Sequence, residues 1–335
     1  FTSGDSIVTA AGSTLKSDTG SVSLTVGVGD NDNDATLTLN GAISAANVTL
    51  SSPGDIVLGQ ISVSEATGAL SVTSTGGSIR DDGDATTFIE AHNISLTAAK
   101  AIGGDTQITR NDVLTQDAVF KQAIDFDLGA GGTLTLSQTG SGGNIQLRNI
   151  DGTTNTSVLG GVEPVGAGNQ LALIASGGGF ANDPGNVAGD LVVDAALSVG
   201  TNNDNLLLAS TNGNNVTVSH TVTNTGTGTV TLVVGGTAAG ASGGALDVNA
   251  AVTAVGSVNL TSAGNAAGDG VFITANVTAS GSGAIITVDA NRDVNITGTN
   301  TTLATTNATG GAIAVTSAEG LPNFPTGGAG VVTMS

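Results

Sequence analysis

Short runs in which Val, Ile or Leu alternates with Thr, Ser or Asn recur along this chain, and Gly-rich turns separate them. They include residues 48–50, 94–96, 134–136, 216–218, 230–232, 258–260 and 313–315. Alternation with a period of two places one row of side chains in a core and the other row in water, which is typical of a β-strand. Because the run recurs from one end of the sequence to the other, we predict a chain that coils on itself as a solenoid.

The apolar residues of the chain are mostly small. Of 335 residues, 52 are Gly and seven are Phe, and Cys, Trp and Tyr are absent. A compact globule of this length uses aromatic rings to fill the gaps between its layers, whereas a solenoid core is narrow enough for Ala, Val, Leu and Ile. We therefore predict a single elongated domain over residues 1–335. The absence of Cys also excludes a disulfide framework and thiol chemistry.

The spacing of the runs predicts the size of a coil. The middle residues of successive runs are Leu50, Val72, Leu96, Leu136, Leu173, Leu207, Leu232, Leu260, Ile286 and Val315. Most steps between them are 22 to 29 residues long, and three are 34 to 40 residues long. The shorter steps fit one coil of a three-sided parallel β-helix, and the longer ones indicate inserted loops or a coil whose anchor is missed. Weaker runs at 55–58 and 144–147 are expected to form second faces of the same coils. The predicted fold is an all-β, elongated parallel β-helix with irregular coils of about 22–29 residues.

One stretch, residues 105–128, departs from the pattern because it contains almost no Gly. Leu114 with Ala118, and Phe120 with Ile124, stand at helical spacing. The stretch is either a loop or short helix that packs on the side of the solenoid, or a pair of ordinary strands with larger side chains.

The net charge of −20, from 27 acidic and seven basic residues, excludes several partners. Nucleic acid binding needs clustered Lys and Arg, and an anionic membrane surface is disfavoured for the same reason. No apolar run approaches the roughly 20 residues that span a bilayer, so membrane insertion is not expected. The chain begins without Met and without a signal peptide, which is typical of a processed segment.

The densest group of oxygen ligands is Asp30, Asp32 and Asp34. Alternating Asp residues on a turn can surround Ca²⁺, which accepts six to eight oxygen ligands. The alternative is an acidic turn in water, and no cofactor is required by the rest of the sequence. A second group, residues 80–84, contains its own Arg, so internal ion pairing is favoured there over a metal.

Nothing in the sequence predicts a catalytic site. His92 and His220, the two histidines, have no partner at metal-ligand spacing, and neither lies beside a nucleophile motif. Enzymes that act on polysaccharides need paired carboxylates or a base beside the sugar, and they usually carry aromatic platforms. Because Trp and Tyr are absent, a polysaccharide-acting enzyme is the least favoured class. Ice binding has weak support, because the alternating Thr residues at 225–231 do not recur at a constant coil period.

The phrases at 77–84, 94–99 and 101–103 resemble the repeats of large exported bacterial β-strand-repeat proteins of the filamentous haemagglutinin-like adhesin type. The resemblance covers nearly the whole chain. It implies a right-handed parallel β-helix, export to the outside of a bacterial cell, and a role in adhesion or in an extracellular matrix.

Neither end of the sequence contains an evident helical cap. Unpaired strands at the ends of a solenoid must be capped or used. We therefore expect a non-enzymatic extracellular structural protein that self-associates through its ends, by stacking or strand exchange, into a filament, matrix or surface layer. The alternative is an adhesin stalk or binding module that recognises a glycan or a cell surface.

Overall fold

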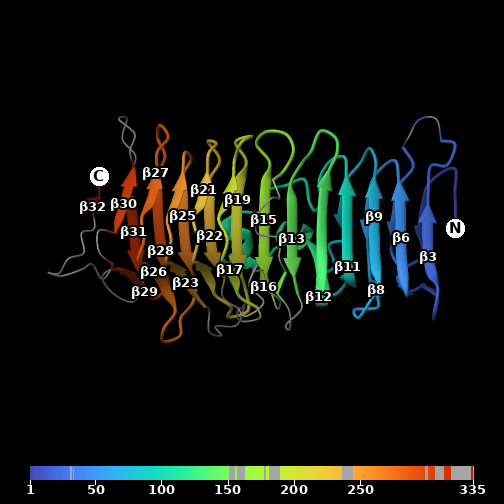
Figure 1. Ribbon diagram of the computed structural model, residues 1–335, viewed down its shortest axis with the longest axis horizontal. Helices are drawn as coiled ribbons and strands as arrows, with labels where there is room; N and C mark the ends of the chain where they lie inside the picture. Colours follow the sequence, from blue (N-terminus) through green and yellow to red (C-terminus); the bar gives the residue numbers. More distant parts are fainter. Residues whose placement is uncertain are drawn as a thin grey trace.

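The computed structural model describes residues 1–30, 32, 34–150, 155–156, 163–176, 179–180, 189–235, 244–298, 301–305, 313–317 and 333–334. Strands stand side by side along the long axis of a rod, with the first and last strands at opposite ends (Figure 1). Half of the chain is strand and 3% is helix, and the chain makes about 10 turns. The predicted parallel β-solenoid is confirmed.

In the N-terminal part, each coil contributes strands to three faces. The first face contains β1 (Ile7–Thr9), β4 (Leu37–Leu39), β7 (Ile56–Leu58) and β10 (Ile79–Asp81). The second contains β2 (Thr14–Lys16), β5 (Ala42–Ala45), β8 (Ile61–Val63) and the first halves of β11 (Ile89–Ala98) and β12 (Ile124–Gln138). The third contains β3 (Ser21–Thr25), β6 (Asn47–Ser52), β9 (Ala69–Ser74) and the second halves of β11 and β12. All of these ladders are parallel.

The C-terminal part also has three parallel sheets. The longest continues from β12 through β13 (Ile145–Asn149), β15 (Gln170–Ala175), β19 (Asn205–Ser210), β22 (Val230–Val234), β25 (Val258–Ser262), β28 (Ile286–Ala290) and β31 (Ile313–Ser317). A seven-stranded sheet contains β14 (Asn155–Thr156), β16 (Gly179–Phe180), β17 (Leu191–Val193), β20 (Val216–Val218), β23 (Ala245–Val248), β26 (Gly270–Ile273) and β29 (Asp293–Ile296). A six-stranded sheet contains β18 (Leu197–Val199), β21 (Val222–Asn224), β24 (Val252–Ala254), β27 (Val277–Ala279), β30 (Thr302–Thr305) and β32 (Thr333–Met334).

The register of the ladders tests the predicted coil length. Leu50 pairs with Val72, and Val72 pairs with Leu96, as the spacing predicted. The 40-residue step from Leu96 to Leu136 is also a direct pairing, because an inserted segment lies between β11 and β12. The run 144–147 lies on a different face from 134–136, as predicted, because Leu147 pairs with Ile124 in the first half of β12. These residues lead into β13, a rung of the main sheet that the anchors missed, and Leu147 of β13 pairs with Leu173.

The core is a column of inward-facing aliphatic side chains from successive rungs. Leu50 and Val72 are completely buried, and each rung contributes similar residues. Two of the largest buried side chains, Phe126 and Phe180, meet edge to face with ring centroids 5.9 Å apart. Phe126 lies in β12 of the main sheet and Phe180 lies in β16 of the seven-stranded sheet. The two rings therefore fill the core where the three N-terminal faces give way to the three C-terminal sheets.

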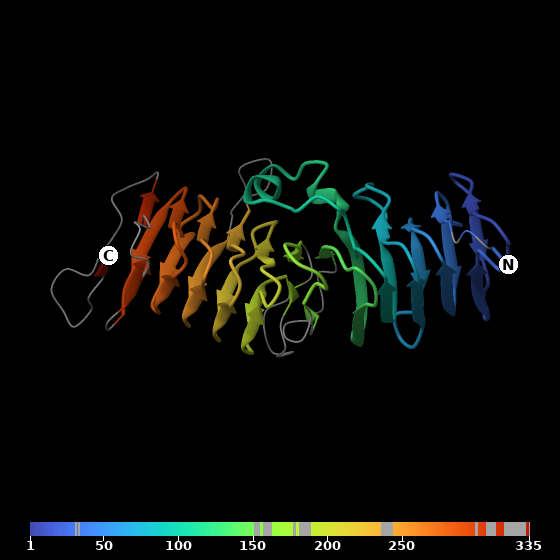
Figure 2. The same ribbon diagram turned by 90° about the horizontal axis from the view of Figure 1, so that it is seen from above.

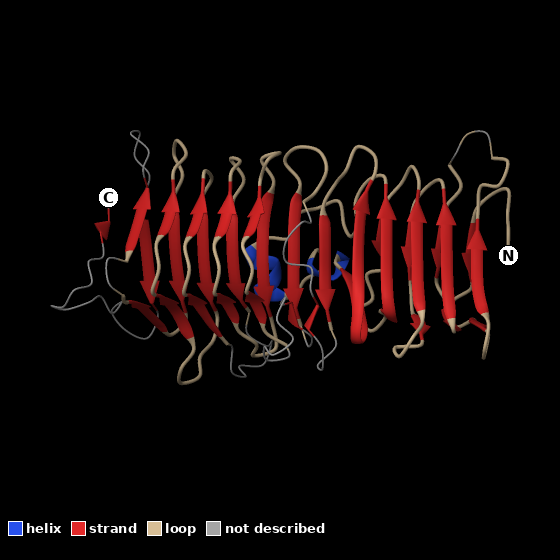
Figure 3. Ribbon diagram, in the orientation of Figure 1, coloured by secondary structure: helices blue, strands red, loops and turns tan. Residues whose placement is uncertain are grey.

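The excursion predicted over 105–128 is confirmed in a shorter form, since residues 124–128 belong to β12; we call the observed segment, residues 104–123, the strap. It contains helix α1 (Arg110–Thr115) and a 3-10 helix, η1 (Phe120–Gln122), and it ends before β12 begins at Ile124. Thr109 caps α1, since its hydroxyl accepts from the Asp112 N–H while the Asp112 carboxylate accepts from the Thr109 N–H. Figure 2 and Figure 3 show the strap along one long side of the rod.

Candidate functional site

The first rung of the rod has unpaired strand edges. Among the described strands, β1 pairs with β4 and β2 pairs with β5, each on its inner side only. The edge of β3 is partly covered by the first three residues, because Phe1 and Ser3 exchange backbone hydrogen bonds with Thr25. No described strand pairs with the outward N–H and C=O groups of β1 and β2, and another strand can add at such an edge.

The same rung exposes large apolar side chains. Phe1, Val8 and Val28 are 78%, 64% and 55% exposed, more than any other large hydrophobic residue in the described part of the chain. Ile7 and Leu15 are only half covered, although they pack against the end of the core. The end of the rod thus combines open backbone groups with apolar surface.

The opposite end has a comparable edge among the residues that the structure describes. Strand β31 pairs with β28 and with no other described strand. Its inward residues Ile313 and Val315 are half-buried and pack against the last part of the core.

The three predicted calcium ligands come together. Asp30, Asp32 and Asp34 each offer a carboxylate oxygen, and these oxygens lie within 4.8 Å of one another. Asp30 also accepts hydrogen bonds from the Asp32 and Ala35 N–H groups, at 3.3 Å each. The hydrogen bond shared with Asp32 lowers the pKa of Asp30 and raises the pKa of Asp32. Calcium binding by this turn stays a prediction.

The Arg of the acidic group at 80–84 forms ion pairs with residues outside the group and not, as predicted, with its own Asp residues. Arg80 forms ion pairs with Asp55 at 3.1 Å and with Asp105 at 2.9 Å. The Asp81 carboxylate instead accepts from the Gly83 N–H at 2.8 Å, so it helps to form its own turn. Arg80 therefore ties β10 to its neighbouring coil and to the strap.

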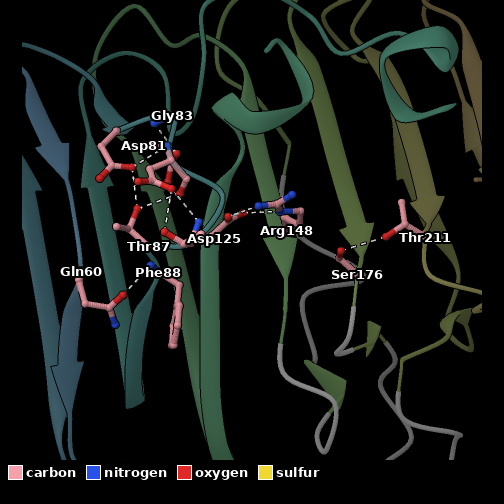
Figure 4. Close-up of polar contacts among 12 residues, drawn as sticks. Gln60, Asp81, Gly83, Thr87, Phe88, Asp125, Arg148, Ser176 and Thr211 are labelled. Carbon is pink, nitrogen blue, oxygen red and sulfur yellow. Dashed lines mark hydrogen bonds and ion pairs between the residues drawn. The ribbon is translucent and has the colours of Figure 1, made fainter. Parts of the chain in front are cut away.

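A cleft of about 600 Å³ lies between the end of β10 and the strap. Its walls include Asp81 and Asp82 from one side and Asp117 and Lys121 from the other. Burial, with the nearby charge of Asp125, raises the pKa of Asp81 to about 8. Figure 4 shows Asp81 beside Asp125 in this region.

A buried ion pair that the sequence analysis did not find lies under the strap. Arg148 of β13 binds both carboxylate oxygens of Asp125 (Figure 4). The guanidinium also stands 5.1 Å from the ring centroid of Phe120 in η1. Burial raises the pKa of Asp125 to about 6, against the opposing effect of Arg148. This group joins β12, β13 and the strap.

Side-chain amides of the main sheet bind the strap backbone. The Gln146 amide accepts from the Gly104 N–H at 2.9 Å and donates to the Thr106 carbonyl at 2.8 Å. In the next rung, Gln170 accepts from the Ile108 N–H at 2.8 Å and donates to its carbonyl at 2.7 Å. The beginning of the strap therefore lies on the sheet like an added strand that is held by side chains.

Apolar residues on the outer surface of three strands form a second core under the strap. They are Ala172, Ile174, Leu207, Ala209 and Val233, and they pack against Ile108, Val113, Phe120 and Ala123. A signal was present in the sequence, because runs 170–175 and 205–210 contain consecutive apolar residues instead of alternating ones. Consecutive apolar residues indicate a strand that is covered on both faces.

The histidines occupy unrelated positions. His92 contacts the Glu65 carbonyl at 3.0 Å through Nδ1, and His220 is exposed. Within the described ranges, the group of Asp30, Asp32 and Asp34 is the one set of three or more acidic or histidine side chains close enough to hold a metal.

Comparison with known protein families, with curated proteins and with solved structures finds no match to this chain. Among the described residues, no helix has the length and apolar character needed to cross a bilayer.

Proposed function

We propose that this chain is a non-enzymatic structural protein outside a bacterial cell, a β-solenoid subunit that associates end to end into a filament or matrix. The observation that carries the proposal is the first rung, where β1 and β2 have open edges beside exposed Phe1, Val8 and Val28. Main-chain pairing at such an edge supplies affinity without requiring a specific side-chain pocket. Head-to-tail contacts that do not close into a ring continue into a fibre.

The net charge of the chain favours contact between the ends of two rods over contact between their sides. With a net charge of −20 on each chain, two rods that lie side by side repel each other. The first rung exposes Phe1, Val8 and Val28 beside the Lys16–Asp18 ion pair, and among the described strands β31 offers a second edge at the far end. The parallel solenoid is also compatible with the adhesin-like β-repeat proteins that the sequence resembles, and their role in surface structures supports the same function.

The alternative is an adhesin that recognises a glycan or cell surface, and its most suitable binding patch would be the strap. The strap is instead held against the sheet by Ile108, Val113 and Phe120, all of which are buried. This packing favours a structural role for the strap. Glycan-array binding that disappears when residues 105–123 are replaced by a short Gly-Ser loop would favour the adhesin.

Variants at the first rung test the filament. We expect Val8→Lys with Val28→Lys to abolish end-to-end chains, because charged side chains protect an open edge. The matched control is Ile285→Lys, since Ile285 is also exposed, at 40%, but lies between β27 and β28 on the side of the rod. Negative-stain microscopy and light scattering measure chain length over a range of concentrations. Short single rods in the unmodified protein at high concentration would contradict the proposal.

A further inference from the structure

The third face of the N-terminal part presents a regular array of hydroxyl groups. The strands β3, β6, β9, β11 and β12 stand side by side on this face (Figure 1). Their outward positions pair across the ladders in two adjacent columns. The first column contains Ser23, Thr49, Ser71, Ser95 and Thr135. The second column contains Thr25, Ser51, Thr73, Thr97 and Ser137. We call these ten residues the hydroxyl array.

Every rung of the array contributes one Ser and one Thr, separated by an aliphatic residue that is buried in four rungs and half-buried in the fifth, at Leu136. The ten side chains are exposed or half-buried. Their hydroxyl groups make no hydrogen bond within the described part of the chain, so they are available to a ligand. By contrast, the adjacent column uses its polar groups internally, as in the 2.8 Å hydrogen bond from the Thr133 hydroxyl to Asn93.

The composition of this face differs from that of the other faces. The two columns and the adjacent third column contain no charged residue, although the chain has a net charge of −20. On the seven-stranded sheet the equivalent outward column is mixed and contains Val192, Thr217, Asp247, Phe272 and Asn295. The six-stranded sheet has a row of hydroxyls at Ser198, Thr223, Thr253 and Thr278, but it forms a single column because each paired segment has one outward position.

The array repeats in two directions. Adjacent rungs are about 4.8 Å apart, and alternate residues along one strand are about 6.7 Å apart, so five rungs cover about 19 Å. A single small molecule cannot use such a repeat, whereas a crystalline surface can. An ionic crystal is disfavoured because the face is uncharged, and a polysaccharide crystal is disfavoured because the columns contain no aromatic ring to stack on sugars.

We infer that the hydroxyl array is a binding surface for ice. Both of its repeats approximate oxygen–oxygen repeats on the faces of hexagonal ice, and each hydroxyl can donate to and accept from lattice water. The parallel ladders fix the hydroxyls in position before binding, so ordering the surface costs little at the moment of contact. Each hydrogen bond contributes modestly because it replaces one with liquid water. Binding therefore depends on many hydroxyls that meet the lattice together.

The alternating Thr residues at 225–231 do not form such a surface. Of these, Thr231 lies in β22, while Thr225 and Thr227 precede the strand. The array was missed in the sequence because its members are 22, 24, 26 or 40 residues apart, and the ladder register brings them into columns.

Retention on growing ice tests the inference. We expect the unmodified chain to be enriched in slowly grown polycrystalline ice, to inhibit ice recrystallisation and to produce thermal hysteresis. Thr73→Lys with Ser95→Lys, at the centre of the array, should lower retention at least tenfold. The matched control, Thr217→Lys with Thr287→Lys, places the same charges on outward positions of other sheets and should retain ice binding. Circular dichroism and gel filtration show that each variant is folded, and Thr73→Ala with Thr97→Ala is the milder variant if the lysines prevent folding.

Three outcomes would overturn the inference. They are exclusion of the unmodified chain from ice, equal loss in the array and control variants, and retention on crystalline cellulose or chitin without retention on ice. Retention is measured per mole of chain, so the result is independent of whether rods join end to end.

Discussion

Replacement of Asp81 by Asn should remove a pH dependence of stability that the structure places at the end of β10. Burial and the charge of Asp125 raise the pKa of Asp81 from 3.8 to about 8. Between these values the folded chain holds a proton that the unfolded chain has released. Stability from this group is therefore complete below pH 4 and is lost as the pH rises through 8.

The difference of about four pKa units corresponds to an upper bound of about 6 kcal/mol, at 1.36 kcal/mol per unit. Asp81 is half-buried and borders the open cleft, so solvent screening reduces the effect. We expect about 1–2 kcal/mol after this reduction. Asn keeps an oxygen that can accept from the Gly83 N–H, so the turn is preserved.

The assay is the urea midpoint of the unmodified chain and of Asp81→Asn from pH 4.5 to pH 9. The two chains should agree near pH 4.5, and the variant should be more stable near pH 9. Asp18→Asn is the control, because Asp18 is exposed and pairs with Lys16 at the surface. A carboxyl NMR titration of Asp81 with a midpoint near 4, or curves that fall in parallel for both chains, would refute the reasoning.

Two further predictions concern the strap and the acidic turn. Phe120→Ala should reduce the free energy that holds the strap on the sheet by about 3 kcal/mol, because it removes a buried ring and its contact with Arg148. Limited proteolysis should then cut within 105–123, while the circular dichroism of the rod is unchanged. Val119→Ala is the control, because Val119 is half-buried. Proteolysis that is unchanged in Phe120→Ala would show that the amide contacts alone hold the strap. The unmodified chain should bind Ca²⁺ at roughly millimolar concentration, as exposed extracellular sites do, and Asp32→Asn with Asp34→Asn should abolish the calorimetric signal; no heat from the unmodified chain would exclude the site.

The sequence was sufficient for the architecture because that information is local. Alternation in a run such as 48–50 decides which side chains face inward, and small aliphatic residues fit a narrow core. Pairings such as Leu50 with Val72 follow directly, since a one-residue slip would turn the whole row outward.

The tertiary structure decided the features that join distant residues. Arg148 and Asp125 are 23 positions apart, and nothing in the sequence around either residue predicts that they form a buried ion pair beside Phe120. The strap could be read as helix or strand until its apolar side was seen to match the outer surface of β15, β19 and β22. The hydroxyl array depends on register in the same way, because Ser and Thr are ordinary outward residues in any single strand. The sequence by itself determined which residues of each rung face water. Only the stacking of the rungs determined which of these residues become neighbours, because the coils differ in length and the sequence therefore contains no constant period that predicts the pairing.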